Sequence, residues 1–149
     1  MILNKPFKDY LFVTIQILLF AAYFLTIPIA TVEFPAWLRY SGLGLFGASS
    51  VFAVVALLQL STNLSPFPSP KESGQLVTKG VFRISRHPIY TALIFMSIGF
   101  GVEQVSIFKI IIGLLLLTLF YFKSNYEESL LLKKFPEYKD YKNNTRRFI

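Results

Sequence analysis

The sequence contains no cysteine and a single histidine, His87, among its 149 residues. The absence of cysteine excludes a disulfide framework and a thiolate metal site, and one histidine excludes a site built from several imidazoles of one chain. Charged residues are scarce at 15%, whereas 54% of the residues are hydrophobic and the mean hydropathy is +0.54. These values exceed those of soluble proteins and indicate an integral membrane protein with a single domain, residues 1–149.

Acidic residues are also few, at 8 against 15 basic residues, and the net charge is +7. Four apolar runs, at about 10–32, 40–60, 88–102 and 105–122, predict four transmembrane helices. Two basic residues precede the first run, four lie in the central loop and seven follow the last run, against Arg39 and Lys109 on the other side. The positive-inside rule therefore predicts that the N-terminus, the central loop and the tail are cytoplasmic. We expect contact with membrane lipids and not with nucleic acid, in the cytoplasmic membrane of a bacterium or archaeon.

The apolar runs predict an all-α fold with recognisable helix ends. Pro28 is expected to kink or end the first helix. The GxGxxG pattern at residues 42–47 lies inside the second apolar run, where small residues favour helix packing over a dinucleotide site. The third and fourth runs predict a tight helical hairpin that begins with Pro88 at the first helical position. We expect the fourth helix to continue to about Lys134, and a short helix to follow Pro136.

This topology brings together two polar segments that lie far apart in the sequence. His87 precedes the third helix and Glu127 follows the fourth span, so both lie at the same end of the hairpin. A site there combines an imidazole, the phenol of Tyr90, basic side chains and the carboxylates of Glu127 and Glu128. That set suits a zwitterionic ligand such as S-adenosylmethionine. Taken singly, the same residues are also typical of a solvated cytoplasmic loop and helix end.

The runs SPFPSPKESGQLVTKGVFRISRHPIYTAL and YEESLLLKKFPEYKDYKNNTRRFI resemble the isoprenylcysteine carboxyl methyltransferase family. The wider group of membrane methyltransferases includes phospholipid N-methyltransferases, and the resemblance covers about residues 63–149. It implies an S-adenosylmethionine-dependent methyltransferase that acts on a lipophilic or small membrane-partitioning acceptor, with a cofactor loop at 71–90, a tail at 123–149 and no metal. The matching positions imply a set of cofactor-binding residues: Gln75, Leu76, Val77, Gly80, Phe82, His87, Pro88, Tyr90, Glu127 and Glu128.

An arginine that the family associates with the substrate carboxylate corresponds to Lys123 here. Lysine keeps the charge but lacks the planar fork of arginine, so a carboxylate, an amine and a thiol all remain open as the acceptor group. Lys123 is also typical of a side chain that snorkels to the membrane surface. Two other classes remain, an NADPH-dependent membrane reductase of the steroid-reductase type and a non-enzymatic membrane adaptor. The oligomeric state is not predicted.

Overall fold

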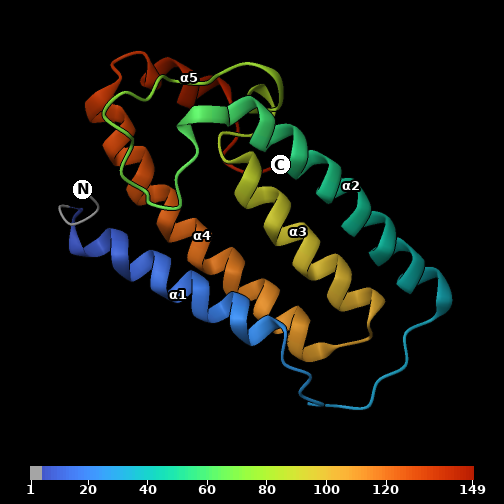
Figure 1. Cartoon of the computed structure of the whole chain (residues 1–149). Helices are drawn as coiled ribbons and strands as arrows, with labels where there is room; N and C mark the ends of the chain where they lie inside the picture. The colour runs from blue at the N-terminus through green and yellow to red at the C-terminus, as the bar shows by residue number, and fades with distance from the viewer. Residues whose placement is uncertain (1–4) are drawn as a thin grey trace.

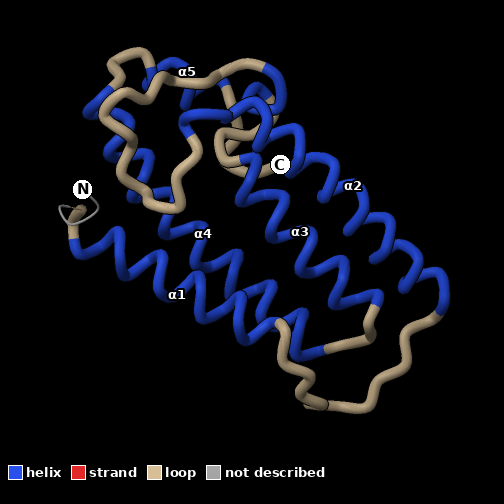
Figure 2. The backbone as a smooth tube through the Cα atoms, viewed as in Figure 1, coloured by secondary structure: helices blue, strands red, loops and turns tan. Residues whose placement is uncertain are grey.

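The computed structural model describes residues 5–149, apart from the side chain of Thr62, and this part of the chain is all-helical (Figure 2). Its only β-type pairing is an isolated bridge between Ser85 and Arg146. The elements are α1 (Phe7–Tyr23), α2 (Ala36–Leu60), α3 (Pro88–Glu103), α4 (Ile107–Lys134) and α5 (Tyr138–Asn144), with short 3-10 helices η1 (Ser61–Asn63) and η2 (Gly80–Arg83). The predicted all-α class is confirmed for the described residues.

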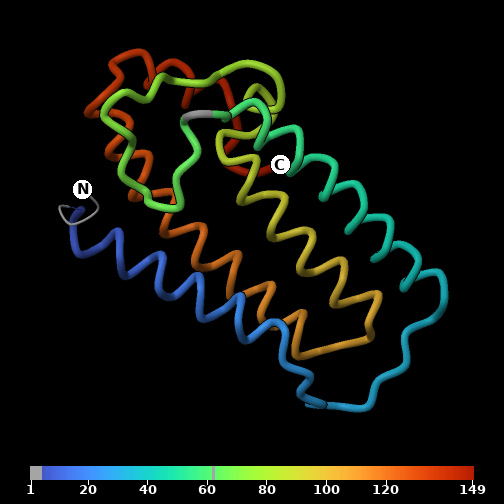
Figure 3. Tube along the Cα trace, viewed as in Figure 1, coloured from blue at the N-terminus to red at the C-terminus, as the bar shows by residue number. Residues whose placement is uncertain are grey.

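The four long helices lie side by side in the order α1, α4, α3, α2 (Figure 1). The hydrophobic core lies between α3 and α4, where Ile94, Ile112, Leu116 and Phe120 are buried. The loop between α2 and α3 crosses one end of the bundle, and α5 and the C-terminus lie at the same end (Figure 3). The predicted meeting of central loop and tail is therefore confirmed.

Helices α2 and α4 are long and apolar enough to cross a membrane, and α3 is a shorter apolar helix. At 1.5 Å per residue, α4 is roughly 42 Å long, which exceeds a hydrocarbon core of about 30 Å. The prediction that the fourth helix continues to Lys134 is confirmed, and the surplus length carries its last turns beyond the apolar run. Many large apolar side chains on α1, α2 and α4 are exposed, as a lipid-facing surface requires.

The first helix is shorter than the predicted run of 10–32, because it ends at Tyr23 and residues 24–35 form no helix. Pro28 lies in this non-helical segment and kinks nothing. The segment carries β-branched residues around Pro28, and proline also disfavours helical geometry at Ile27 before it. Hydropathy alone predicted that this segment belongs to the first span. The helix nevertheless ends before it, because proline and β-branched residues disfavour helical backbone angles.

The glycines of the GxGxxG pattern lie inside α2, and one of them, Gly42, is in close contact with α3. A Cβ atom on Gly42 would lie 2.7 Å from the carbonyl oxygen of Gly99, whereas Gly44 and Gly47 face open space. The prediction of helix packing is therefore confirmed for Gly42. No strand precedes these glycines in the described chain, so the dinucleotide fingerprint lacks its structural context.

Candidate active site

The turn that leads into α3 is held by backbone bonds to the end of the chain. The amide of Arg86 donates to the carbonyl of Arg146 at 2.8 Å, and the amide of His87 donates to that of Arg147 at 3.2 Å. The Ser85 hydroxyl also donates to the Arg147 carbonyl, at 2.8 Å. Residues 145–149, here called the terminal strap, thus fix the backbone of residues 85–87 and the position of His87 at the start of α3.

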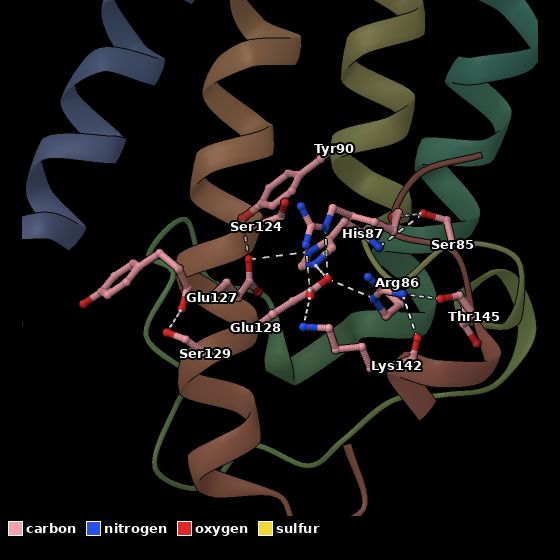
Figure 4. A network of polar contacts seen from close by, with 12 residues as sticks. Ser85, Arg86, His87, Tyr90, Ser124, Glu127, Glu128, Ser129, Lys142 and Thr145 are labelled. Carbon is pink, nitrogen blue, oxygen red and sulfur yellow. Dashed lines mark hydrogen bonds and ion pairs between the residues drawn. The ribbon is translucent and has the colours of Figure 1, made fainter. Parts of the chain in front are cut away.

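Glu128 is a fully buried carboxylate that gathers the cations of the loop and tail (Figure 4). Its oxygens lie 2.9 Å from Arg86 Nε, 3.1 Å from Lys142 Nζ and 3.3 Å from an Arg147 nitrogen. His87 Nε2 approaches it at 3.2 Å. A buried charge needs such partners, because an unpaired carboxylate would be strongly destabilising. Glu128 therefore joins α4, α5, the loop and the terminal strap.

Glu127 is the next residue on α4 but faces a different environment. Its side chain is 25% exposed, and Oε2 accepts a hydrogen bond from the Tyr90 hydroxyl at 2.8 Å. His87 Nδ1 lies 3.7 Å from the same oxygen. Successive residues of an α-helix point about 100° apart, so one glutamate enters the buried ion cluster while the other stays on an accessible wall. The imidazole of His87 lies between the two carboxylates.

A first cavity, of about 120 Å³, lies between the central loop, α4 and α5. Six of the predicted cofactor residues line it: Gln75, Leu76, Val77, Phe82, His87 and Glu127. Tyr138 and Tyr141 of α5 complete the wall. The Tyr141 hydroxyl donates to the Phe82 carbonyl, and burial raises the pKa of Tyr141 to about 12, so this donor stays protonated at neutral pH. The loop and the tail together thus enclose one space.

Tyr138 lines the first cavity, and its buried hydroxyl has no hydrogen-bond partner among the described residues. The side chain is 1% exposed, and burial raises the pKa of this phenol above its ordinary value. Buried hydroxyl groups in proteins nearly always have a partner. The orphaned hydroxyl therefore leaves a hydrogen-bonding group unused on a residue that lines this cavity.

A second cavity, of about 300 Å³, adjoins the first. The two cavities share the walls formed by Phe82, Arg86, His87 and Glu127. The second cavity extends from this shared wall toward the helices, where its lining includes Gln16, Leu64, Pro66, Pro88, Tyr90, Leu93 and Lys123. Two of the predicted cofactor residues, Pro88 and Tyr90, therefore face the second cavity and not the first.

Lys123 lies inside the protein, with 1% of the residue exposed. Its ammonium group donates to the Gln16 side chain at 2.6 Å and to the Pro66 carbonyl at 2.8 Å. The same nitrogen lies 5.3 Å from the centre of the Tyr90 ring. This burial contradicts the snorkelling interpretation, because a snorkelling ammonium is exposed to water, whereas that of Lys123 is bonded inside the protein. Lys123 instead joins α4 to α1 and to the proline-containing loop, on the wall of the second cavity.

Gly80 and Glu128 line neither cavity, although the sequence predicted both as cofactor residues. Gly80 has a φ of +62°, and a Cβ atom there would lie 2.3 Å from the Gln59 side chain. The Gln59 side chain accepts a hydrogen bond from the Val81 amide at 2.9 Å. Gly80 thus shapes the turn into η2, and Glu128 holds the ion cluster beneath the site.

Sequence reasoning missed several residues that build the site. Gln16 gave a usable signal, since it is the one amide within the apolar run 10–32. No such signal marked Ser85, Lys142 and Arg147, because in the sequence they resemble ordinary loop and tail residues. Their roles arise from tertiary contacts with Glu128 and with the backbone at the start of α3.

Comparison with curated proteins found no match. The model of the phospholipid methyltransferase family matches residues 37–138. This range covers more than half of the chain and includes all but the first residue of α2, together with α3, α4 and the loop that lines both cavities. Helix α1, most of α5 and the terminal strap lie outside it. The chain belongs to the phospholipid methyltransferase family.

Proposed function

We propose that this protein transfers a methyl group from S-adenosylmethionine to a lipophilic acceptor at the membrane. One observation carries the proposal: two cavities meet at a common wall formed by His87 and Glu127. The first is enclosed by the polar loop and tail, and the second leads toward apolar helices. This arrangement suits a water-soluble methyl donor and a lipid-soluble acceptor that react across one boundary.

The chemistry of the first cavity fits S-adenosylmethionine. Leu76, Val77 and Phe82 offer apolar surfaces for an adenine ring, and the partly exposed Glu127 carboxylate suits ribose hydroxyls or an ammonium group. The unpartnered hydroxyl of Tyr138 supplies a further polar contact. When bound, the cofactor would supply an electrophilic methyl group on a sulfonium. The protein contributes the shape and polarity of the pocket that holds it.

The residues of the second cavity would position the acceptor. The buried cation of Lys123 suits an electron-rich head group, and the shared wall sets the direction of approach. A carboxylate or thiolate acceptor needs no base, whereas an ammonium must lose a proton, which Glu127 or His87 is placed to accept. The acceptor group is therefore a carboxylate, an amine or a thiol.

We further propose that all four long helices cross or enter the membrane, with both cavities near its cytoplasmic side. Helices α1 and α3 are short for a full span, at 17 and 16 residues. They nevertheless pack alongside α4 and α2, and the basic loop and tail lie at one end of the bundle. The positive-inside rule assigns that end to the cytoplasm.

Calorimetry on the purified, folded protein tests the cofactor assignment. S-adenosylhomocysteine is expected to bind, and NADPH is not. Absence of S-adenosylhomocysteine binding at millimolar ligand would overturn the proposal, and binding of NADPH in its place would favour a reductase. A second assay measures transfer of a radiolabelled methyl group to dodecylamine, dodecanethiol and dodecanoic acid, and the head group that is methylated identifies the acceptor class.

A further inference from the structure

A third cavity, of about 300 Å³, opens between the helices and is lined almost entirely by apolar residues. Its lining comes from all four long helices: Phe20, Tyr23, Phe24, Phe46, Leu93, Met96, Ser97, Phe100 and Leu116. Leu93 also lines the second cavity, so the two spaces adjoin at this side chain. Nothing in the site described so far uses this space.

The helical register places the second and third cavities along the same helix faces, and these two adjoining spaces are here called the corridor. On α1, Gln16 of the second cavity is followed on the same face by Phe20 and Tyr23 of the third, four and seven residues later. On α4, Lys123 of the second cavity and Leu116 of the third are also seven residues apart. Each of these helices thus presents a polar residue to the second cavity, beside the shared wall of His87 and Glu127. On the same face, its apolar residues line the third cavity.

On α3 the corridor runs from Tyr90 through Leu93 to Phe100, ten residues and roughly 15 Å along the helix axis. Aromatic rings mark its far end. The Tyr23 hydroxyl donates to the Ser97 carbonyl at 2.6 Å, and the ammonium of Lys109 lies 4.7 Å from the Phe100 ring centre and 5.8 Å from that of Tyr23. These contacts hold both rings in place, and Phe100 is the last residue of α3 that lines the corridor.

We propose that this third cavity binds the hydrocarbon chain of the methyl acceptor and limits its length at Phe100 and Tyr23. The inference rests on the proposed function and specifies its substrate class: an acceptor with one apolar chain of about dodecyl length and a reactive group at its end. The shared side chain of Leu93 favours the acceptor's own chain over an unrelated lipid, because a chain that passes it from the third cavity brings its head beside Lys123 and Glu127.

Binding can be measured without methyl transfer, by fluorescence quenching. The chain has one tryptophan, the exposed Trp37, so Trp37→Phe gives a silent background. In it, Phe46→Trp places a reporter in the third cavity, and Phe122→Trp places a control on the exposed surface of α4. We expect 12-bromododecanol to quench the first reporter saturably and in competition with dodecanol. The second should show only unsaturable quenching from partition into detergent. Equal, unsaturable quenching of both reporters would overturn the proposal.

Competition by octanol, dodecanol and hexadecanol then measures the length limit. Dodecanol should compete about tenfold better than hexadecanol, as expected for a fitted apolar pocket. Phe100→Ala should remove that difference by opening the end, whereas Phe122→Ala should preserve it. A missing length preference, or the same preference in both variants, would refute the limit at Phe100.

The link to the acceptor is tested in the methylation assay. Dodecanol should raise the KM for whichever dodecyl acceptor is methylated and leave S-adenosylhomocysteine binding unchanged. Saturable quenching without this competition would mean a resident structural lipid and would overturn the assignment. If no acceptor is methylated and S-adenosylhomocysteine does not bind, the proposed function fails, and the assignment to an acceptor chain fails with it. Methylation without any length preference refutes only the present inference.

Discussion

The hydroxyl of Tyr90 donates a hydrogen bond to Oε2 of Glu127 at 2.8 Å, across 37 residues of sequence. Tyr90 lines the second cavity, whereas Glu127 lines both, so this contact connects the second cavity to the wall that it shares with the first. Tyr90 also stacks on Phe120 of the core, with ring centres 4.6 Å apart. The shared wall therefore rests on the packed interface of α3 and α4.

Glu127→Ala and His87→Ala should each weaken S-adenosylhomocysteine binding at least about tenfold, or about 1.4 kcal/mol. Both side chains line the first cavity, and Glu127 offers its accessible carboxylate. Calorimetry measures the effect. Glu137→Ala, which removes an exposed carboxylate outside both cavities, serves as the control and should bind normally. Wild-type affinity in both site variants would refute the assigned pocket.

Tyr138→Phe should lower S-adenosylhomocysteine affinity without destabilising the fold. The hydroxyl has no hydrogen-bond partner among the described residues, so its removal breaks no protein contact. A ligand hydrogen bond lost here corresponds to about 0.5–1.5 kcal/mol. Calorimetry and thermal unfolding measure the two effects, with the exposed Tyr40→Phe as control. Unchanged affinity would show that the ligand does not reach this hydroxyl.

Lys123→Met should lower kcat/KM about tenfold or more while changing cofactor affinity much less. The ammonium lies on the wall of the second cavity and not of the first, and methionine preserves most of the side-chain volume. Lys133→Met, on the exposed end of the same helix, is the control. Radiolabel transfer and calorimetry separate the two readouts. Unchanged kinetics would remove Lys123 from the acceptor site, whereas an equal loss in both readouts would indicate a general structural role.

Glu128→Ala should destabilise the protein by about 3–5 kcal/mol, because three cationic side chains would lose a buried partner. Thermal unfolding in detergent checks this. Lys142→Ala should cost less, about 1 kcal/mol or below, since its side chain is 36% exposed. Asp140→Ala removes an exposed carboxylate of α5 and should have little effect. A stable Glu128→Ala protein would show that the ion cluster is dispensable.

Gly42→Ala and Gly44→Ala should shift stability in opposite directions, although both lie in the same helix. A Cβ atom at Gly42 would clash with the backbone of α3, so the two helices would have to separate. Gly44 faces open space, where alanine is favoured over glycine by up to about 1 kcal/mol. Thermal unfolding distinguishes them. Equal effects would contradict the close α2–α3 crossing at Gly42.

Hydropathy and helix-end signals predicted most of the bundle. Pro88 at the start of α3 and the continuation of α4 to Lys134 follow from local chemistry, and both are confirmed. The predicted hairpin placed His87 beside Glu127 because its two helices are antiparallel neighbours. The first helix was mispredicted, since apolar composition does not distinguish helix from the extended segment around Pro28.

The division of roles between Glu127 and Glu128 could not be predicted from the sequence. Adjacent glutamates look equivalent until the packing of α5 and the terminal strap places Lys142 and Arg147 against one of them. The hydrogen bond between Lys123 and Gln16 could not be predicted from the sequence either. Gln16 lies 107 residues away in sequence, and only the packing of α1 on α4 brings the two together.

The terminal strap also has a consequence for biosynthesis. Arg86 bonds to the carbonyl of a residue 60 positions later, so the turn that holds His87 is made long before its support exists. At ribosomal speeds of about 5–20 residues per second, roughly 3 to 12 seconds separate the two syntheses. During that interval α3 and α4 can insert and pair, but the His87 turn lacks the strap that fixes it. A nascent chain therefore cannot complete the site until the strap has left the ribosome.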